Sequence, residues 1–338
     1  MKLVLPHGGY GLGNDLIPWA KGFILAQELG ARLLHPAWGN NPRKYYKYFR
    51  TFPYDYQVYR ILRRTLPRYR FTEEDYRTIG IDSFSESCKV FVRNYDLKNK
   101  QNYIIEITGF WGAFEGIGAA TDFIISCLSN TAHTQENIST IKKKLHKDKL
   151  TVGIHVRLGD FWQAGQLDYP GAEQISIPLD WYCYIRDELG ASLGSENVQF
   201  IICSDGRIEE LTELVDRSNA LFASSLPNSD ISDLFLLKNA DLLICSISSY
   251  SMWAAFLSNS PYVWYRPNLI DSQDGYVNKF VRSLGIYTPI QGFNKSVAGR
   301  GVALSIGDPF PNHLIDHLRI LHRNKQARFD LIRGGAIS

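Results

Sequence analysis

Short apolar runs alternate with longer amphipathic stretches along most of this chain. In the first third, apolar runs at residues 3–5 and 31–34 flank a helical pattern over residues 14–29, and residues 103–107 form a further run. Asn14 or Asp15 is expected to cap this helix, Pro18 to lie in its first turn, and Gly30 to end it.

The second half of the chain repeats this alternation more regularly. Strand-like runs cover residues 151–156, 198–203, 220–222, 241–245 and 262–265. Helical patterns cover residues 179–189, 208–217, 231–239 and 252–257, and an amphipathic pattern at residues 311–328 predicts a closing helix. Strands that alternate with helices predict an α/β fold with parallel, doubly wound, Rossmann-like sheets.

The length of 338 residues favours two domains, because single cores stop growing below this size. The lysine-rich, polar residues 142–149 are the best linker candidate. We therefore expect domains at residues 1–145 and 146–310, followed by a helix and tail at residues 311–338.

Composition excludes some classes of protein. With 45% hydrophobic and 21% charged residues the chain is not intrinsically disordered, and a net charge of +3 indicates no particular partner. The five cysteines are scattered singly, without metal-ligand or redox spacing, as in a reduced protein. The first apolar run is too short for a signal peptide, and none is long enough to cross a membrane. These features predict a cytoplasmic protein.

One stretch, residues 43–70, departs from the α/β pattern. It holds nine Lys or Arg, seven Tyr and a single acid, Asp55. We interpret it as an irregular or helical insertion. It is a candidate for peripheral contact with anionic lipid, a phosphorylated acceptor or nucleic acid, and the alternative is a solvated face with tyrosines packed beneath it.

The strand at residues 151–156 runs directly into a charged turn that contains His155, Arg157 and Asp160. Ligands of open α/β sheets bind at the carboxyl ends of strands, and a guanidinium there can hold a phosphate through two hydrogen bonds. The alternative is that His155 and Asp160 pair with Arg157 and only pin the turn.

Two further strand ends carry polar residues. Ser204 and Asp205 follow the strand at residues 198–203; Asp205 can accept from a ribose hydroxyl or a guanine edge, or cap the helix that begins near Arg207. The last strand end opens a helix with four hydroxyls within six residues, more than capping requires: Ser246, Ser248, Ser249 and Ser251. Such a helix start is suited to an anion.

Metal-binding patterns are absent from the sequence: there is no Asp-x-Asp pair, and no His cluster has ligand spacing. The glycine-rich loop at residues 7–13 does not fit a dinucleotide fingerprint, because Asn14 replaces the third glycine and His35 stands where an acid is needed. The loop either lets backbone approach a ligand or is a plain tight turn.

Together the three strand ends resemble the α-1,2-fucosyltransferases and, more loosely, the wider fucosyltransferase superfamily. The family's His-x-Arg-Arg-Gly-Asp turn is matched by residues 155–160, its Ser-Asp strand end by residues 204–205, and its Asn-Ser-Ser-Phe-Ser-Trp-Trp-Ala-Ala segment by residues 246–255. The opening Gly-Gly-Leu-Gly-Asn-Gln is echoed by residues 9–15. The chain departs from the family's motifs at some of these positions: Asp15 replaces glutamine, Leu158 replaces the second arginine, and Met252 replaces the first tryptophan.

The resemblance implies a two-domain GT-B fold with the acceptor on the N-terminal side and the nucleotide sugar in the C-terminal domain. It further implies an inverting fucosyltransferase that needs no metal or other cofactor, takes GDP-fucose as donor and forms an α-1,2 linkage on a glycan. A lipid-linked polysaccharide precursor is one candidate acceptor, and no nucleic acid is expected as a partner.

The resemblance also carries site residues over by position. Arg157, with Asp160, would be catalytic, Arg157 binding the β-phosphate. The remaining nucleotide-sugar residues would be His155, Ser204, Asp205, Ser248, Ser249, Tyr250 and Ser251. Gly11, Asn14 and Asp15 would line the acceptor cleft. Candidates for the general base are Asp15, Asp160 and Glu115. The two alternative functions are a transferase for a different GDP-sugar and a non-catalytic protein that binds a nucleotide or polyanion.

Overall fold

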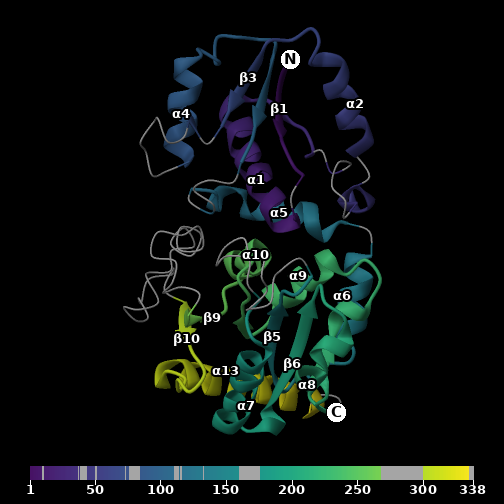
Figure 1. Ribbon diagram of the computed structural model, residues 1–338, viewed down its shortest axis with the longest axis vertical. Coiled ribbons are helices and arrows are strands. Elements are labelled where there is room, and N and C mark those ends of the chain that lie inside the picture. Colours follow the sequence, from purple (N-terminus) through teal and green to yellow (C-terminus); the bar gives the residue numbers. More distant parts are fainter. Residues whose placement is uncertain are drawn as a thin grey trace, which may run out of the picture. The chain divides into compact units, whose positions relative to one another are not determined.

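The computed structural model describes residues 1–9, 11–36, 38, 44–49, 52–72, 74–75, 84–109, 114, 116–131, 133–159, 176–267 and 300–334 (Figure 1). The chain divides into two compact units, Met1–Ala132 and His133–Ser338. The sequence places this boundary at residues 145 and 146. It falls earlier because α6 (Thr134–Lys142) packs on a helix of the second unit, and Asn137 of α6 donates to the Pro227 carbonyl at 3.0 Å.

The first unit is built on a four-stranded parallel sheet in the order β2-β1-β4-β3. Its strands are β1 (Lys2–Pro6), β2 (Arg32–Leu33), β3 (Arg68–Phe71) and β4 (Tyr103–Ile107). Its helices are α1 (Leu12–Leu29), η2 (Tyr45–Tyr48), α2 (Phe52–Leu62), α4 (Phe84–Asn94), η3 (Gly118–Ala120) and α5 (Thr121–Ser129). Helix α1 and strands β1 and β4 bury most of their side chains, and they form the core of this unit.

Helix α1 begins earlier than the sequence pattern indicates. Gly11 is the residue before its first turn, so Asn14 and Asp15 lie inside the helix and neither caps it. Pro18 consequently lies in the second turn, where it leaves the Asn14 carbonyl without its helical donor. The expected end is confirmed, because Gly30 has a left-handed backbone with φ of 58° that closes the helix.

The second unit is built on a six-stranded parallel sheet in the order β10-β9-β8-β5-β6-β7. Its strands are β5 (Leu150–Val156), β6 (Val198–Ser204), β7 (Ala220–Phe222), β8 (Leu242–Ile244), β9 (Tyr262–Tyr265) and β10 (Gly301–Leu304). Besides α6, its helices are α7 (Leu179–Leu193), η5 (Ser195–Asn197), η6 (Ile208–Leu211), α8 (Thr212–Val215), η7 (Ala223–Ser225), α9 (Asp230–Lys238), α10 (Ser249–Leu257) and α13 (Asn312–Gly334).

The strand order of this second sheet locates its binding edge. From the central β5 the chain adds β6 and β7 on one side, and then β8, β9 and β10 on the other. The order therefore reverses between β5 and β8, and doubly wound sheets bind ligands outside the carboxyl ends of strands at such a point. The predicted α/β fold with parallel, Rossmann-like sheets is confirmed.

Two strands are absent from the sequence prediction. β3 lies within the basic stretch at residues 43–70, where exposed Arg68 and Arg70 alternate with less exposed Tyr69 and buried Phe71. β10 pairs with β9 at the edge of the second sheet and is only four residues long. The sequence pattern misses β3 because its arginines make the segment look polar, and it misses β10 because the strand is short.

Candidate active site

The carboxyl ends of β5 and β6 bring Arg157 and Asp205 together. The two strands pair in register from Leu150 and Val198 onward and run in the same direction (Figure 1). Arg157 Nη1 forms an ion pair with Asp205 Oδ2. The other carboxylate oxygen, Oδ1, accepts hydrogen bonds from the backbone N–H groups of Leu158 at 2.9 Å and Gly159 at 3.1 Å.

This arrangement keeps Asp205 ionised. Burial alone opposes the negative charge, but the Arg157 guanidinium and the two backbone donors lower the pKa of Asp205. Asp205 does not cap the following helix, since Glu210 accepts the Arg207 N–H at 2.7 Å. Arg157 pairs with Asp205, and Asp160, the partner that the pinning alternative invokes, lies outside the described residues.

Two glycines are needed for the turns to interlock. A Cβ on Gly159 would lie 2.5 Å from Asp205 Oδ2, and a Cβ on Gly206 would lie 2.6 Å from Leu158 Cδ1. A Cβ at either position would force the facing side chain, Asp205 or Leu158, to move. The missing side chains of Gly159 and Gly206 therefore leave room for Asp205 and Leu158 in their observed positions.

His155, at the end of β5, is buried and joined to the start of α10. Its Nδ1 lies 2.6 Å from Ser251 Oγ and 2.9 Å from Ser246 Oγ, while Ser251 Oγ also accepts the Ser246 N–H at 3.2 Å. The Tyr250 ring lies 4.9 Å away between centroids. Burial lowers the pKa of His155 to about 3, so the imidazole is neutral. These bonds cross the switch point between β5 and β8.

The serines at this helix start have separate roles. Ser248 caps α10 by accepting the Tyr250 N–H at 3.2 Å, and Ser246 and Ser251 hold His155. Tyr250 donates its hydroxyl to the Asp230 carbonyl. Ser249 forms no hydrogen bond to any residue in the described part of the chain, and its hydroxyl is half-buried beside the helix N-terminus.

The backbone of Ser204 is held by a chain of two hydrogen bonds, here called the Ser224 relay, that the sequence does not predict. Its N–H donates to Ser224 Oγ at 2.9 Å, and the Ser224 hydroxyl donates to Asp233 Oδ2 at 2.5 Å. Asp233 lies in the first turn of α9, as expected, and is buried with Oδ1 unpartnered among the described residues. Burial raises the pKa of Asp233 to about 7. Ser224 belongs to no motif, so only the fold identifies it.

Gly11, Asn14 and Asp15 all lie at the start of α1 in the first unit. Asp15 is fully buried, and its two oxygens accept the Gly9 N–H at 3.2 and 3.3 Å. A Cβ on Gly8 would lie 3.0 Å from Asp15 Oδ2, so this carboxylate fixes the glycine-rich loop. Such burial favours a role in holding the loop over direct contact with an acceptor. Glu115, another base candidate, lies outside the described residues.

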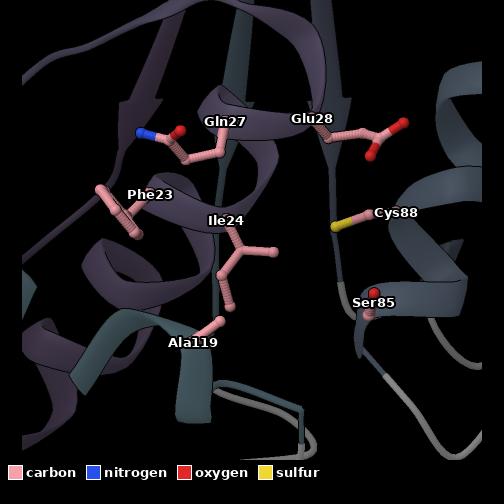
Figure 2. A pocket seen from close by; sticks show the side chains of 7 residues that line it. All are labelled: Phe23, Ile24, Gln27, Glu28, Ser85, Cys88 and Ala119. Atoms are coloured by element: carbon pink, nitrogen blue, oxygen red, sulfur yellow. The ribbon is translucent and has the colours of Figure 1, made fainter. Parts of the chain in front are cut away.

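A cavity of about 500 Å³ in the first unit contains none of the predicted site residues. Figure 2 shows its lining side chains, which come from α1, α4 and η3 and include Glu28 and Cys88. Glu28 pairs with Lys98 at 2.6 Å, and burial raises the pKa of the Cys88 thiol. This lining offers no cation to a phosphate.

Within the described residues, no group of three His, Cys, Asp or Glu side chains is placed to hold a metal ion. None of the described helices is both long and apolar enough to span a membrane.

A guanidinium, a neutral imidazole and a serine-rich helix start lie near the switch point of this doubly wound sheet. The glycosyl transferase family 11 pattern matches residues 90–274, more than half of the chain, and the chain belongs to this family. The matched region includes Arg157, Asp205 and α10. The resemblance to the fucosyltransferases and the prediction of an enzyme of that kind are confirmed.

Solved structures of fucosyltransferases are similar to this chain. NodZ from Bradyrhizobium is 13% identical, with a TM-score of 0.45 over 76% of this chain and 92% of that one. A mutant of FUT1 from Arabidopsis thaliana in complex with GDP is 15% identical, with a TM-score of 0.44 over 79% of this chain and 71% of that one. POFUT1 in complex with GDP-fucose is 12% identical, with a TM-score of 0.44 over 78% and 97%. No curated protein sequence matches the chain.

Proposed function

We propose that this protein transfers L-fucose from GDP-fucose to a hydroxyl of a glycan acceptor, with inversion and without a metal ion, in an α-1,2 linkage. The carrying observation is the Arg157–Asp205 pair at the carboxyl ends of β5 and β6, next to the switch point that His155 and Ser246 bridge. The family of the chain supports a glycosyl donor. NodZ has been soaked with GDP-fucose and POFUT1 crystallised with it, which supports this donor.

Each residue has a distinct part in the proposed reaction. Negative charge builds on the diphosphate as the sugar–oxygen bond breaks, and the Arg157 guanidinium stabilises it. His155 and Asp205 hold the guanosine part, with Ser204 beside them. Ser248 and Ser249, at the positive end of α10, donate to the phosphates, while Tyr250 and Ser251 hold the start of the helix in place. Asp160 completes the turn, and Gly11, Asn14 and Asp15 shape the loop on the acceptor side.

The two alternative functions are a non-catalytic binding protein and a transferase for a different GDP-sugar, and both can be distinguished from this proposal. Family membership disfavours a non-catalytic binding protein. A different GDP-sugar stays open, because Leu158 replaces the second arginine of the fucosyltransferase turn. The donor must therefore be identified by experiment.

The test compares wild type with Arg157→Ala and Arg157→Lys in the presence of EDTA. We expect GDP-fucose to raise the thermal midpoint of wild type more than GDP-mannose, UDP-glucose or NAD, and both variants to lose this shift. Transfer should fall by about 10²–10³-fold in both, from the ~2.7–4 kcal/mol that one preorganised donor contributes. Lysine cannot replace arginine, because its point charge does not reproduce the planar fork.

Arg319→Ala is the matched control, since Arg319 forms an exposed pair with Asp316 at 3.2 Å on α13. Asp205 keeps its two backbone donors in the Arg157 variants, so these should fold. A GDP-mannose shift larger than that of GDP-fucose would replace the donor in this proposal. No shift with any GDP compound would contradict it altogether.

We further propose that α2 touches anionic lipid at the cytoplasmic face of a membrane, where a lipid-linked acceptor would lie. Tyr54 and Ile61 are 72% and 68% exposed, and Arg60 of α2 and Arg64, two residues after its end, are exposed as well. Asp55, the single acid among residues 43–70, is buried and pairs with Arg32 at 2.7 Å. The exposed side of α2 is thus cationic and apolar, as an interfacial helix requires.

A further inference from the structure

The first unit has a switch point of its own, and a histidine and a glutamate meet there. The chain runs from β1 to β2 on one side and later adds β4 on the other side of β1. Glu106 lies opposite Leu5 near the end of β4, and the residue after β1, His7, donates its N–H to the Ile107 carbonyl at 2.8 Å. His7 Nε2 lies 3.7 Å from Glu106 Oε2.

Glu106 is buried, with 2% of its side chain exposed, yet remains a carboxylate. The Tyr59 hydroxyl donates to Oε1 at 3.1 Å, and Arg70 Nε donates to Oε2 at 3.1 Å. Arg68 Nη1 lies 3.6 Å from Oε1. Burial opposes ionisation, but Tyr59, His7 and Arg70 together lower the pKa of Glu106. This carboxylate is fixed by groups from α2 and β3, so its orientation toward His7 is fixed too.

The two nitrogens of His7 differ in their surroundings. Nε2 is buried and has no hydrogen-bond partner in the described part of the structure, and it faces Glu106. Nδ1 makes no hydrogen bond to any described residue, and the side chain is 38% exposed. A carboxylate beside Nε2 favours the proton on that nitrogen, which leaves the Nδ1 lone pair able to accept a proton. Catalytic contacts of this length commonly shorten when substrate binds.

The protonation state also suits a base. Burial lowers the pKa of His7, Glu106 raises it and Arg70 lowers it, and the net effect is a decrease. The ring is therefore neutral near pH 7. The next two residues, Gly8 and Gly9, have no side chains to block an acceptor, and Gly9 has a φ of 138° that suits glycine.

We propose that His7 is the general base of the glycosyl transfer, with Glu106 as its positioning residue. This proposal rests on the proposed function. As the acceptor oxygen bonds to the anomeric carbon, its proton passes to His7 Nδ1, and the carbon–oxygen bond to the diphosphate breaks with its electron pair leaving on GDP. The imidazolium that results is stabilised by the Glu106 carboxylate, and it later releases the proton to water.

The test measures transfer, GDP binding and the pH profile for His7→Gln, Glu106→Gln and wild type. We expect His7→Gln to lower kcat by about 10²-fold or more, within the usual contribution of a general base, with GDP affinity within about twofold of wild type. The acidic limb of the kcat/KM profile should disappear. In Glu106→Gln the same limb should move to lower pH, because the group that raises the pKa of His7 is gone.

His133→Asn is the matched control, since His133 forms an exposed pair with Glu136 at 3.8 Å and asparagine tolerates its left-handed backbone. Added imidazole should restore part of the rate of His7→Gly and none of the rate of Arg157→Ala. A His7→Gln enzyme with wild-type kcat and pH profile overturns the base assignment and leaves the proposed function standing. Absence of transfer and GDP binding in wild type overturns both.

Discussion

Asp205 and Asp233 are two acids near neighbouring strand ends, with opposite electrostatic environments. Asp205 has a guanidinium and two backbone donors, whereas Asp233 Oδ2 has only the hydroxyls of Ser224 and Ser229, at 2.5 and 3.1 Å. Hydroxyl groups do not compensate for the loss of water around a full charge, so the pKa of Asp233 rises while that of Asp205 falls. Near neutral pH one residue is an anion and the other is partly a neutral acid.

This difference predicts how stability depends on pH. The pKa of Asp233 is raised to about 7 in the folded chain and is about 4 when unfolded, so the folded state binds the extra proton between these values. Its contribution to the free energy of unfolding is complete below about pH 4 and is lost as the pH rises to about 7. Asp233→Asn should remove this decline, as urea unfolding at pH 5 and pH 7.5 would show.

The exposed Asp216 provides the comparison, because Asp216→Asn should keep the wild-type decline. An Asp233→Asn protein with the same decline as wild type would show that Asp233 is ionised throughout. The Ser224 relay to the Ser204 backbone would then rest on a charged acceptor.

The sequence was sufficient to predict which residues gather at the candidate site, but not which hydrogen bonds and ion pairs they form. The tips of parallel strands must share one edge, so His155, Arg157 and Asp205 were expected together. The bonds that order them, His155 to Ser246 and Ser251 and Arg157 to Asp205, depend on the β5–β8 and β5–β6 registers. Registers are set by packing over the whole sheet, and single residues do not encode them.

Among the elements, α2 combines exposed cations with exposed apolar side chains, and this makes the lipid proposal testable. Each Lys or Arg close to an anionic surface contributes about 1 kcal/mol. Arg60→Glu/Arg64→Glu should reduce sedimentation with vesicles of phosphatidylcholine and phosphatidylglycerol by at least tenfold in affinity. Vesicles of phosphatidylcholine alone should bind neither protein strongly.

Lys143→Glu/Lys144→Glu makes the same change in net charge at exposed positions after α6. Equal loss of vesicle binding in this variant would attribute the affinity to total charge and remove α2 as the contact. Salt should weaken the wild-type interaction, because exposed charges are screened.

Sequence periodicity predicted α1, β5 and β6 because each has a long apolar face. It missed β3, since the exposed Arg68 and Arg70 side chains dominate the composition there although Phe71 is buried. The function of these arginines, which is to hold Glu106, becomes visible only when β3 is paired with β4.

At the scale of the whole molecule, the proposed reaction assigns donor binding and acceptor binding to different units. The residues assigned to GDP all belong to His133–Ser338, and those assigned to the acceptor belong to Met1–Ala132. GDP alone should therefore slow amide hydrogen exchange at the ends of β5 and β6 and the start of α10. Exchange in β1 and β4 should change little, and equal protection of both units would contradict the division.

The neutral, buried His155 has a consequence for how the enzyme is studied. The lowered pKa of Asp205 keeps its carboxylate negative, and the pKa of His155 lies too low for protonation in ordinary buffers. Asp205 and His155 therefore keep the same charge in mildly acidic and mildly alkaline solution, whereas Asp233, which supports Ser204 through Ser224, changes its charge near pH 7. A pH profile of turnover measured in an Asp233→Asn background therefore reports on His7 without the titration of Asp233.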